Sequence, residues 1–178
     1  MGYDCAEAMN WYRAMDAITR QHLQRCIELA AEALEAGDQP FGSVLVGADG
    51  SVLAEDRNRV NSVDATYHPE IELARWAARN LCAAERAETT MYTSGEHCPM
   101  CAGAHGCAGL GRIVYASSAE QLAAWRQELG IDRGGAQPLR IQDIVPHVPV
   151  DGPFPEMAAH VRTLYRRSQG VIDARSMR

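Results

Sequence analysis

The sequence has 178 residues, of which 47% are hydrophobic and 22% are charged. This composition is ordinary for a folded globular chain, and no segment approaches the apolar length that a membrane-spanning helix requires. All 17 basic residues are arginine and the formal net charge is −6, so the chain lacks the electrostatic signature of a general nucleic-acid-binding protein. We therefore expect a single domain over residues 1–178 that acts on a small molecule and does not bind a membrane.

The N-terminal segment and the cysteine content favour a cytoplasmic protein. Residues 1–18 lack both the basic lead and the uninterrupted apolar stretch of a secretory signal. The six cysteines are then expected to be free thiols or metal ligands, because disulfide frameworks belong mainly to small exported domains.

The first half of the chain predicts a helix, a hairpin and a second helix. Apolar residues recur every three to four positions from Met15 to Ala36, which indicates an amphipathic helix that ends at Gly37. Residues 41–55 contain two β-rich runs around a "GADGS" turn, which is typical of an antiparallel hairpin. Residues 68–82 carry apolar side chains on more than one face, as in a helix that packs against a sheet.

The second half of the chain alternates strands and helices. Residues 88–94 and 112–118 are expected to be short buried strands, with a helix over residues 98–111 between them. Such crossovers make neighbouring strands parallel. Residues 119–130 predict a further helix, and residues 139–145 (LRIQDIV) a fifth strand parallel to the fourth.

These elements together predict an α/β fold, a three-layer α/β/α sandwich around a five-stranded mixed sheet. The core is expected over about residues 15–145. Residues 146–170 are expected to form a proline-rich extended tail followed by a helix over residues 155–167.

His68, Cys98 and Cys101 are the candidate metal ligands. One imidazole and two thiolates suit Zn²⁺ in a tetrahedral site, and three protein ligands leave a fourth position for a catalytic water. Pro69 and Pro99 fit the first positions of the two predicted helices, so the ligands stand at helix N-termini, where unpaired N–H groups favour thiolate. Parallel crossovers bring both helix starts to one edge of the sheet, where a single metal ion can bridge them.

Glu70 is the candidate catalytic acid and base, because it follows His68 by two residues and lies close enough to take a proton from the metal's water. Two other interpretations stay open. His68 and the two cysteines could be ordinary buried core residues. Alternatively, Cys98, Cys101 and His105 could hold a structural zinc.

The motif H-x-E at residues 68–70 is followed by C-x-x-C at residues 98–101, with 27 residues between the glutamate and the first cysteine. This arrangement resembles the zinc-dependent cytidine deaminase-like superfamily. The flanks "PFGSVLVGADGSVLAEDRN" and "GRIVYASS" agree with the resemblance over about residues 41–118.

The resemblance implies one Zn²⁺ per chain on the three candidate ligands. It also implies a reaction in which zinc-bound hydroxide attacks the amine-bearing carbon of a nucleobase ring, Glu70 carries the protons and ammonia leaves. Members of the superfamily commonly form dimers, so a homodimer is expected.

Asn58, Phe41 and His97 are the candidate substrate contacts. The resemblance places the family's base-contacting asparagine at Asn58, which could instead cap a turn. Phe41 resembles an aromatic of the guanine deaminase branch that can stack on a base, and it could equally belong to the core. His97 stands where the family usually has proline, and we expect it at the pocket.

These features favour the branch that holds guanine, cytosine and tRNA adenosine deaminases, with guanine as the leading substrate. Cytosine and tRNA adenosine remain alternatives, although the acidic net charge of −6 weakens the tRNA hypothesis. A non-catalytic module in which zinc only joins helices is the alternative from a different functional class.

Overall fold

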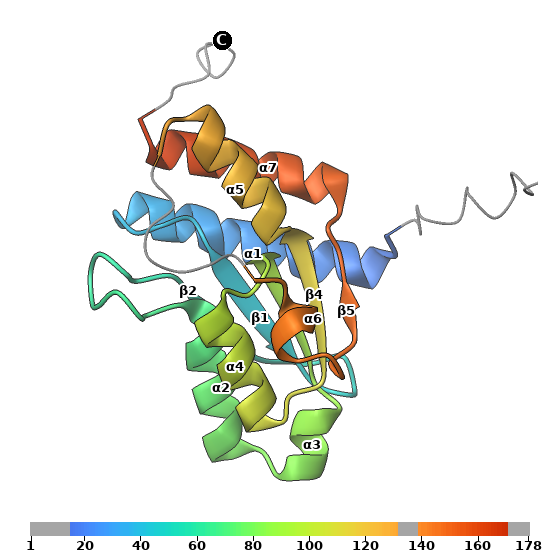
Figure 1. Cartoon of the computed structure of the whole chain (residues 1–178). Coiled ribbons are helices and arrows are strands. Elements are labelled where there is room, and N and C mark those ends of the chain that lie inside the picture. The colour runs from blue at the N-terminus through green and yellow to red at the C-terminus, as the bar shows by residue number, and fades with distance from the viewer. Residues whose placement is uncertain (1–14, 132–138, 171–178) are drawn as a thin grey trace, which may run out of the picture.

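The computed structural model describes residues 15–131 and 139–170, and the predicted domain limits at residues 1 and 178 lie outside these ranges. Figure 1 shows the elements of the fold. In chain order they are α1 (Ala17–Glu35), β1 (Gly42–Val46), β2 (Val52–Arg57), α2 (Pro69–Asn80), α3 (Ala83–Ala87), β3 (Thr90–Gly95), α4 (Pro99–Ala108), β4 (Arg112–Ser117), α5 (Ala119–Glu128), α6 (Ile141–Ile144), β5 (Val150–Asp151) and α7 (Pro155–Ser168).

A five-stranded mixed sheet forms the centre of the fold, as predicted. The strand order is β2-β1-β3-β4-β5. Strand β1 pairs antiparallel with both β2 and β3, whereas the β3–β4 and β4–β5 pairs are parallel. The predicted hairpin and the predicted parallel pairing of the third and fourth strands are therefore confirmed.

The crossover through α2 does not join neighbouring strands, because β1 lies between β2 and β3. Every residue of β1 is buried, whereas the residues of β2 are exposed or half-buried. The more apolar strand therefore takes the central position, and β2 becomes an edge strand.

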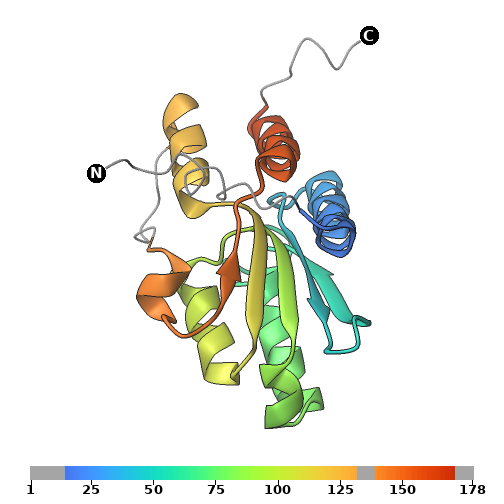
Figure 2. The ribbon, with the colours of Figure 1, turned by 90° about the vertical axis from the view of Figure 1, so that its right-hand side faces the viewer.

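Helices cover both faces of the sheet, which confirms the predicted three-layer α/β/α sandwich. Helices α1 and α7 lie on one face, and α2 and α4 lie on the other (Figures 1 and 2). The first face is sealed by a core that joins the sheet to α1, α5 and α7 through residues such as Leu23, Val44 and Val161. The opposite core joins the sheet to α2 through Leu45 and Leu73.

Residues 139–145 do not form the fifth strand, and this prediction was wrong. They contain the short helix α6, in which Ile141 is buried and Ile144 follows at the three-residue spacing of one helical turn. The fifth strand is β5, which has only two residues and lies within the predicted extended tail. It is parallel to β4, as was expected of the fifth strand. So short a strand leaves no alternating pattern in a sequence.

The longer helices agree with their predicted ranges. Helix α1 begins where the Asp16 side chain accepts a hydrogen bond of 2.7 Å from the Thr19 amide, and α7 begins at Pro155 as expected. Helix α3, which directly follows α2, was not predicted. Within the described ranges no helix combines the length and the apolar character needed to span a bilayer.

Candidate metal centre

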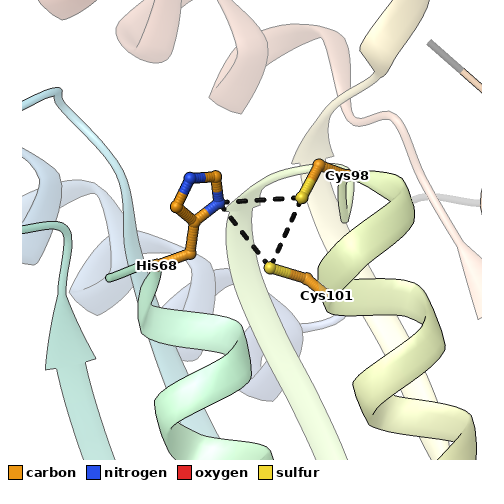
Figure 3. Close-up of side chains that lie close together, drawn as sticks. All are labelled: His68, Cys98 and Cys101. Carbon is orange, nitrogen blue, oxygen red and sulfur yellow. Dashed lines mark hydrogen bonds between the residues drawn. The ribbon is translucent and has the colours of Figure 1, made fainter. Parts of the chain in front are cut away.

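The predicted metal ligands come from the N-termini of α2 and α4, which pack against each other at one face of the sheet. His68 is the N-cap of α2 and Cys98 is the N-cap of α4, and each has extended backbone before a proline at the first helical position. Proline fits there because its missing N–H would have no helical partner. Cys101 lies in the first turn of α4, on the side that faces His68 (Figure 3).

The structure brings the three predicted ligands together (Figure 3). His68 Nδ1 lies 3.7 Å from Cys98 Sγ and 3.6 Å from Cys101 Sγ, and the two sulfurs are 3.5 Å apart. A tetrahedral zinc with bonds of about 2.3 Å to sulfur and about 2.0 Å to nitrogen separates its ligands by about 3.5–3.8 Å. The donor atoms therefore already have the spacing that one tetrahedral zinc ion requires.

The rival zinc set of Cys98, Cys101 and His105 does not form. His105 Nε2 lies 2.9 Å from the Gly111 carbonyl oxygen, and its ring is fully buried away from the cluster. Among residues 15–131 and 139–170, no fourth histidine, cysteine or carboxylate joins the group of three. Within the described part of the chain, the geometry thus leaves a fourth coordination position to a non-protein ligand.

The contacts within the cluster themselves favour a thiolate at Cys98. Hydrogen bonding from Cys101 and from His68 lowers the pKa of Cys98 to about 4. The same contact with Cys98, together with burial, raises the pKa of Cys101, so that thiol holds its proton. A metal that binds both sulfurs as thiolates displaces this remaining proton.

Glu70 is buried beside the cluster, in the first turn of α2. Its Oε1 accepts a hydrogen bond of 3.1 Å from Thr93 Oγ1, and its Oε2 lies 3.6 Å from Cys101 Sγ. Burial raises the pKa of the Glu70 carboxyl above its usual value. The predicted acid and base is thus adjacent to the candidate metal centre, with one oxygen fixed by β3.

Asn58 and Phe41 are joined through the backbone. The Asn58 amide donates to the Phe41 carbonyl at 2.9 Å, and Asn58 Oδ1 accepts from the Val60 amide at 3.0 Å. Asn58 therefore does cap a turn, and within the described part of the chain its Nδ2 donates to no protein group. The half-buried Phe41 packs against the core beside Gly95, at the end of β3.

His97 lies in the interior of the protein. Its side chain is 0% exposed, and its ring contacts that of His105 edge to face, with 5.4 Å between centroids. Neither ring nitrogen of His97 has a hydrogen-bond partner among the described residues. This position does not support the predicted contact between His97 and a substrate.

Two buried side chains that support the candidate site were not anticipated from the sequence. Thr93 holds Glu70, and Asp38 accepts hydrogen bonds from the backbone amides of Asn61 and Ser62 in the loop that leads to His68. The two-residue alternation of β3 could have placed Thr93 on the face that α2 covers. No local pattern connects Asp38 to its distant loop.

This fold and its His-Cys-Cys cluster define a cytidine deaminase-like α/β protein. Residues 17–139 match the MafB19-like deaminase family, and the chain belongs to that family.

Curated relatives include deaminases of several kinds. The guanine deaminase of Bacillus subtilis (strain 168) is 41% identical over 97 residues, which cover 53% of this chain and 62% of that protein. A probable cytosine deaminase of Schizosaccharomyces pombe is 31% identical over 61% of this chain and 66% of its own length. The tRNA-specific adenosine deaminase of Haemophilus influenzae is 33% identical over 54% of this chain and 56% of its own. The matches therefore span about three fifths of these relatives.

Solved structures show the same fold. The X-ray structure of guanine deaminase from Bacillus subtilis is 30% identical, has a TM-score of 0.53, and aligns with 71% of this chain and 89% of its own. A guanine deaminase structure from Nitrosomonas europaea has a TM-score of 0.66 over 84% of this chain and 83% of its own, at 20% identity. The latter likeness concerns the fold alone.

Proposed function

We propose that this protein is a zinc-dependent hydrolase that removes the amino group of a nucleobase, with guanine as the leading substrate. The proposal rests on the convergence of His68 Nδ1, Cys98 Sγ and Cys101 Sγ beside the buried carboxylate of Glu70. One imidazole, two thiolates and a fourth position left for water form the donor set of a catalytic zinc. Membership of a deaminase family supports the reaction class.

The proposed roles of the side chains follow from their positions. His68, Cys98 and Cys101 would hold zinc, which as a Lewis acid lowers the pKa of water at such a site to about 7. Glu70 would move protons through Oε2, because its Oε1 is held by Thr93. It would take a proton from water, deliver it to the ring nitrogen, and pass a second to the departing amine, so that water and the amino-heterocycle yield a carbonyl and ammonia.

One observation favours guanine among the candidate substrates, and a second weighs against tRNA. The B. subtilis guanine deaminase is 41% identical over the matched region. The net charge of −6 suits a small base better than a tRNA. In this proposal Asn58 binds the base through Nδ2 and Phe41 stacks on its ring.

Ammonia release against a substrate panel tests the proposal. The panel holds guanine, cytosine, adenine, their nucleosides and unmodified tRNA, each with the zinc-loaded full chain. We expect the largest kcat/KM for guanine. Release from tRNA alone, or a preference for cytosine, would replace guanine by that alternative while leaving the deaminase proposal intact.

A variant of Glu70 separates an enzyme from a structural zinc module. Glu70→Ala should keep the zinc content of the parent and lose at least about 100-fold in kcat. Glu72→Ala is the matched control, because Glu72 is on the same helix but outside the cluster. A zinc-loaded parent that deaminates no member of the panel would support the structural module.

We propose a homodimer in the cytoplasm. Light scattering of the full chain after gel filtration tests the dimer, and a mass equal to one chain would contradict it.

A further inference from the structure

Glu96 connects three segments at the edge of the sheet where the candidate metal centre lies. It follows β3 directly and precedes Cys98 by two residues. Its Oε2 accepts a hydrogen bond of 2.8 Å from the Ala119 amide, and its Oε1 accepts one of 3.1 Å from the Ile141 amide. Its own amide donates to the Ser117 carbonyl at 2.8 Å.

The two backbone amides that donate to Glu96 belong to the first residues of two helices. Ala119 begins α5 and Ile141 begins α6. Backbone N–H groups in a first helical turn have no partner within the helix, so each needs an acceptor from elsewhere when it is shielded from water. One carboxylate therefore satisfies two helix starts that are far apart in the sequence.

The far end of α6 is fixed by α4 itself. A Cβ atom on Gly106 of α4 would lie 2.5 Å from Val145 Cγ1, so α6 is seated where α4 has no side chain. Helix α6 is thus held at its start by Glu96 and at its end by the helix that carries Cys98 and Cys101. The segment from Glu96 to Cys98 therefore lies between the hydrogen bonds of Glu96 on one side and the packing of α4 against α6 on the other.

We propose that Glu96 is a positioning residue that sets the place of Cys98 in the candidate metal centre. The inference rests on the proposed zinc site but adds a residue that does not touch the ion. Both oxygens of Glu96 are engaged by backbone amides, and Glu96 is not in the cluster of candidate ligands. It acts on the metal through the short connection to Cys98, as supporting hydrogen bonds commonly do at metal sites.

Zinc affinity of the full chain, measured by competition with a chromogenic chelator, tests the proposal. Glu96→Gln has nearly the same shape but turns an amide NH₂ toward one of the two helix amides, so one contact is lost. We expect its zinc affinity to fall by about 10- to 100-fold. With Co²⁺ in place of zinc, we expect the thiolate-to-metal absorption to weaken or shift. Glu120→Gln is the matched control, because Glu120 is an exposed neighbour in α5 and should bind both metals as the parent does.

A second variant removes one of these two contacts, the one with Ala119, from the side of the donor. Ala119→Pro deletes the amide that donates to Glu96 Oε2, and proline is well tolerated at the first position of a helix. It should also lower the zinc affinity, and it tests the role of Glu96 even if Glu96→Gln does not fold. Folded variants with the zinc affinity and Co²⁺ spectrum of the parent would overturn the proposal, even if their melting temperatures fall. Failure of the parent itself to bind either metal would contradict the proposed function instead.

Discussion

The hydroxyl of Thr93 donates a hydrogen bond of 3.1 Å to Glu70 Oε1, and it accepts one of 2.9 Å from the hydroxyl of Ser43. All three side chains are buried. Strands β1 and β3 therefore reach the proposed proton-transfer group of α2 through a chain of two hydrogen bonds. This chain leaves Glu70 Oε2 as the oxygen that faces the sulfur cluster.

Thr93→Val should lower kcat more than it changes KM. Valine keeps the shape of threonine but cannot hold Glu70, and a hydrogen bond to a charged group is worth about 1.5–3 kcal/mol, or about 10- to 100-fold in rate. Steady-state kinetics on the preferred base measures the effect. Thr163→Val, the same change on the exposed face of α7, is the control.

Ser43 complicates the Thr93 variant, because its buried hydroxyl loses an acceptor. The double variant Ser43→Ala/Thr93→Val removes that unpaired group and should recover part of the lost stability, but not kcat. A Thr93→Val enzyme with the kcat of the parent would show that the hydrogen bond does not position Glu70 for proton transfer.

Asp38 should make the stability of the protein depend on pH. Burial by itself would raise the pKa of Asp38, but hydrogen bonds from Ser62, Asn61 and Arg57 outweigh it, and the pKa lies below its usual value of 3.8. The stability that this carboxylate contributes is therefore complete above pH of about 4 and is lost as pH falls through the folded-state pKa.

Asp38→Asn should lower the free energy of unfolding by about 1–3 kcal/mol near neutral pH, and the difference from the parent should shrink below pH of about 4. Urea unfolding of the metal-free chain at several pH values measures both, without a contribution from metal release. Glu120→Gln serves as the control for loss of an exposed carboxylate. A difference that stays constant across the pH range would contradict the assigned role.

The sequence was most informative where a few neighbouring residues decide the structure. His68 and Pro69, like Cys98 and Pro99, define a ligand and the start of a helix in adjacent positions, and both helix starts lie where they were predicted. The hairpin of β1 and β2 is equally local, since a turn of glycine and aspartate lies between two β-rich runs.

Features that depend on distant contacts could not be predicted in the same way. Residues 139–145 become helical where the first amide of α6 meets Glu96, a partner 45 positions away in the sequence. His97 adjoins Cys98 in the sequence, yet its side chain packs into the interior against His105. Because His97 adjoins Cys98 in the sequence, its backbone could be placed near the site, but the direction of its side chain could not be predicted.

Zinc should stabilise the folded chain, because a ligand that binds only the folded state adds about 2.7 kcal/mol at 100 times its Kd. Removal of metal with a chelator should therefore lower the Tm, and zinc should restore it. Cys98→Ser should abolish most of this response. Cys107→Ser is the control, since Cys107 is an exposed cysteine of the same helix outside the cluster. If zinc raised the Tm of both variants equally, Cys98 would not be a zinc ligand.

Two glycines of α4 should respond in opposite directions to alanine. A Cβ on Gly103 meets no atom within 4 Å, so Gly103→Ala should stabilise the chain by about 0.5–1 kcal/mol through its lower backbone entropy when unfolded. A Cβ on Gly106 would lie 2.5 Å from Val145 Cγ1. Gly106→Ala should therefore cost about 1–3 kcal/mol, because α6 must move away from α4. Urea unfolding of the zinc-loaded chain measures both changes.

The double variant Gly106→Ala/Val145→Ala tests whether the clash with α6 causes the loss. Removing Val145 Cγ1 makes room for the new methyl group, so the two substitutions should together cost less than the sum of their separate effects. Both single changes replace glycine by alanine in one helix, so their intrinsic propensity contributions have the same sign and the clash decides the direction of the difference. If Gly106→Ala stabilised the chain as much as Gly103→Ala does, α6 would not be seated against α4. The contact that holds the end of α6, on which the positioning role of Glu96 partly rests, would then be contradicted.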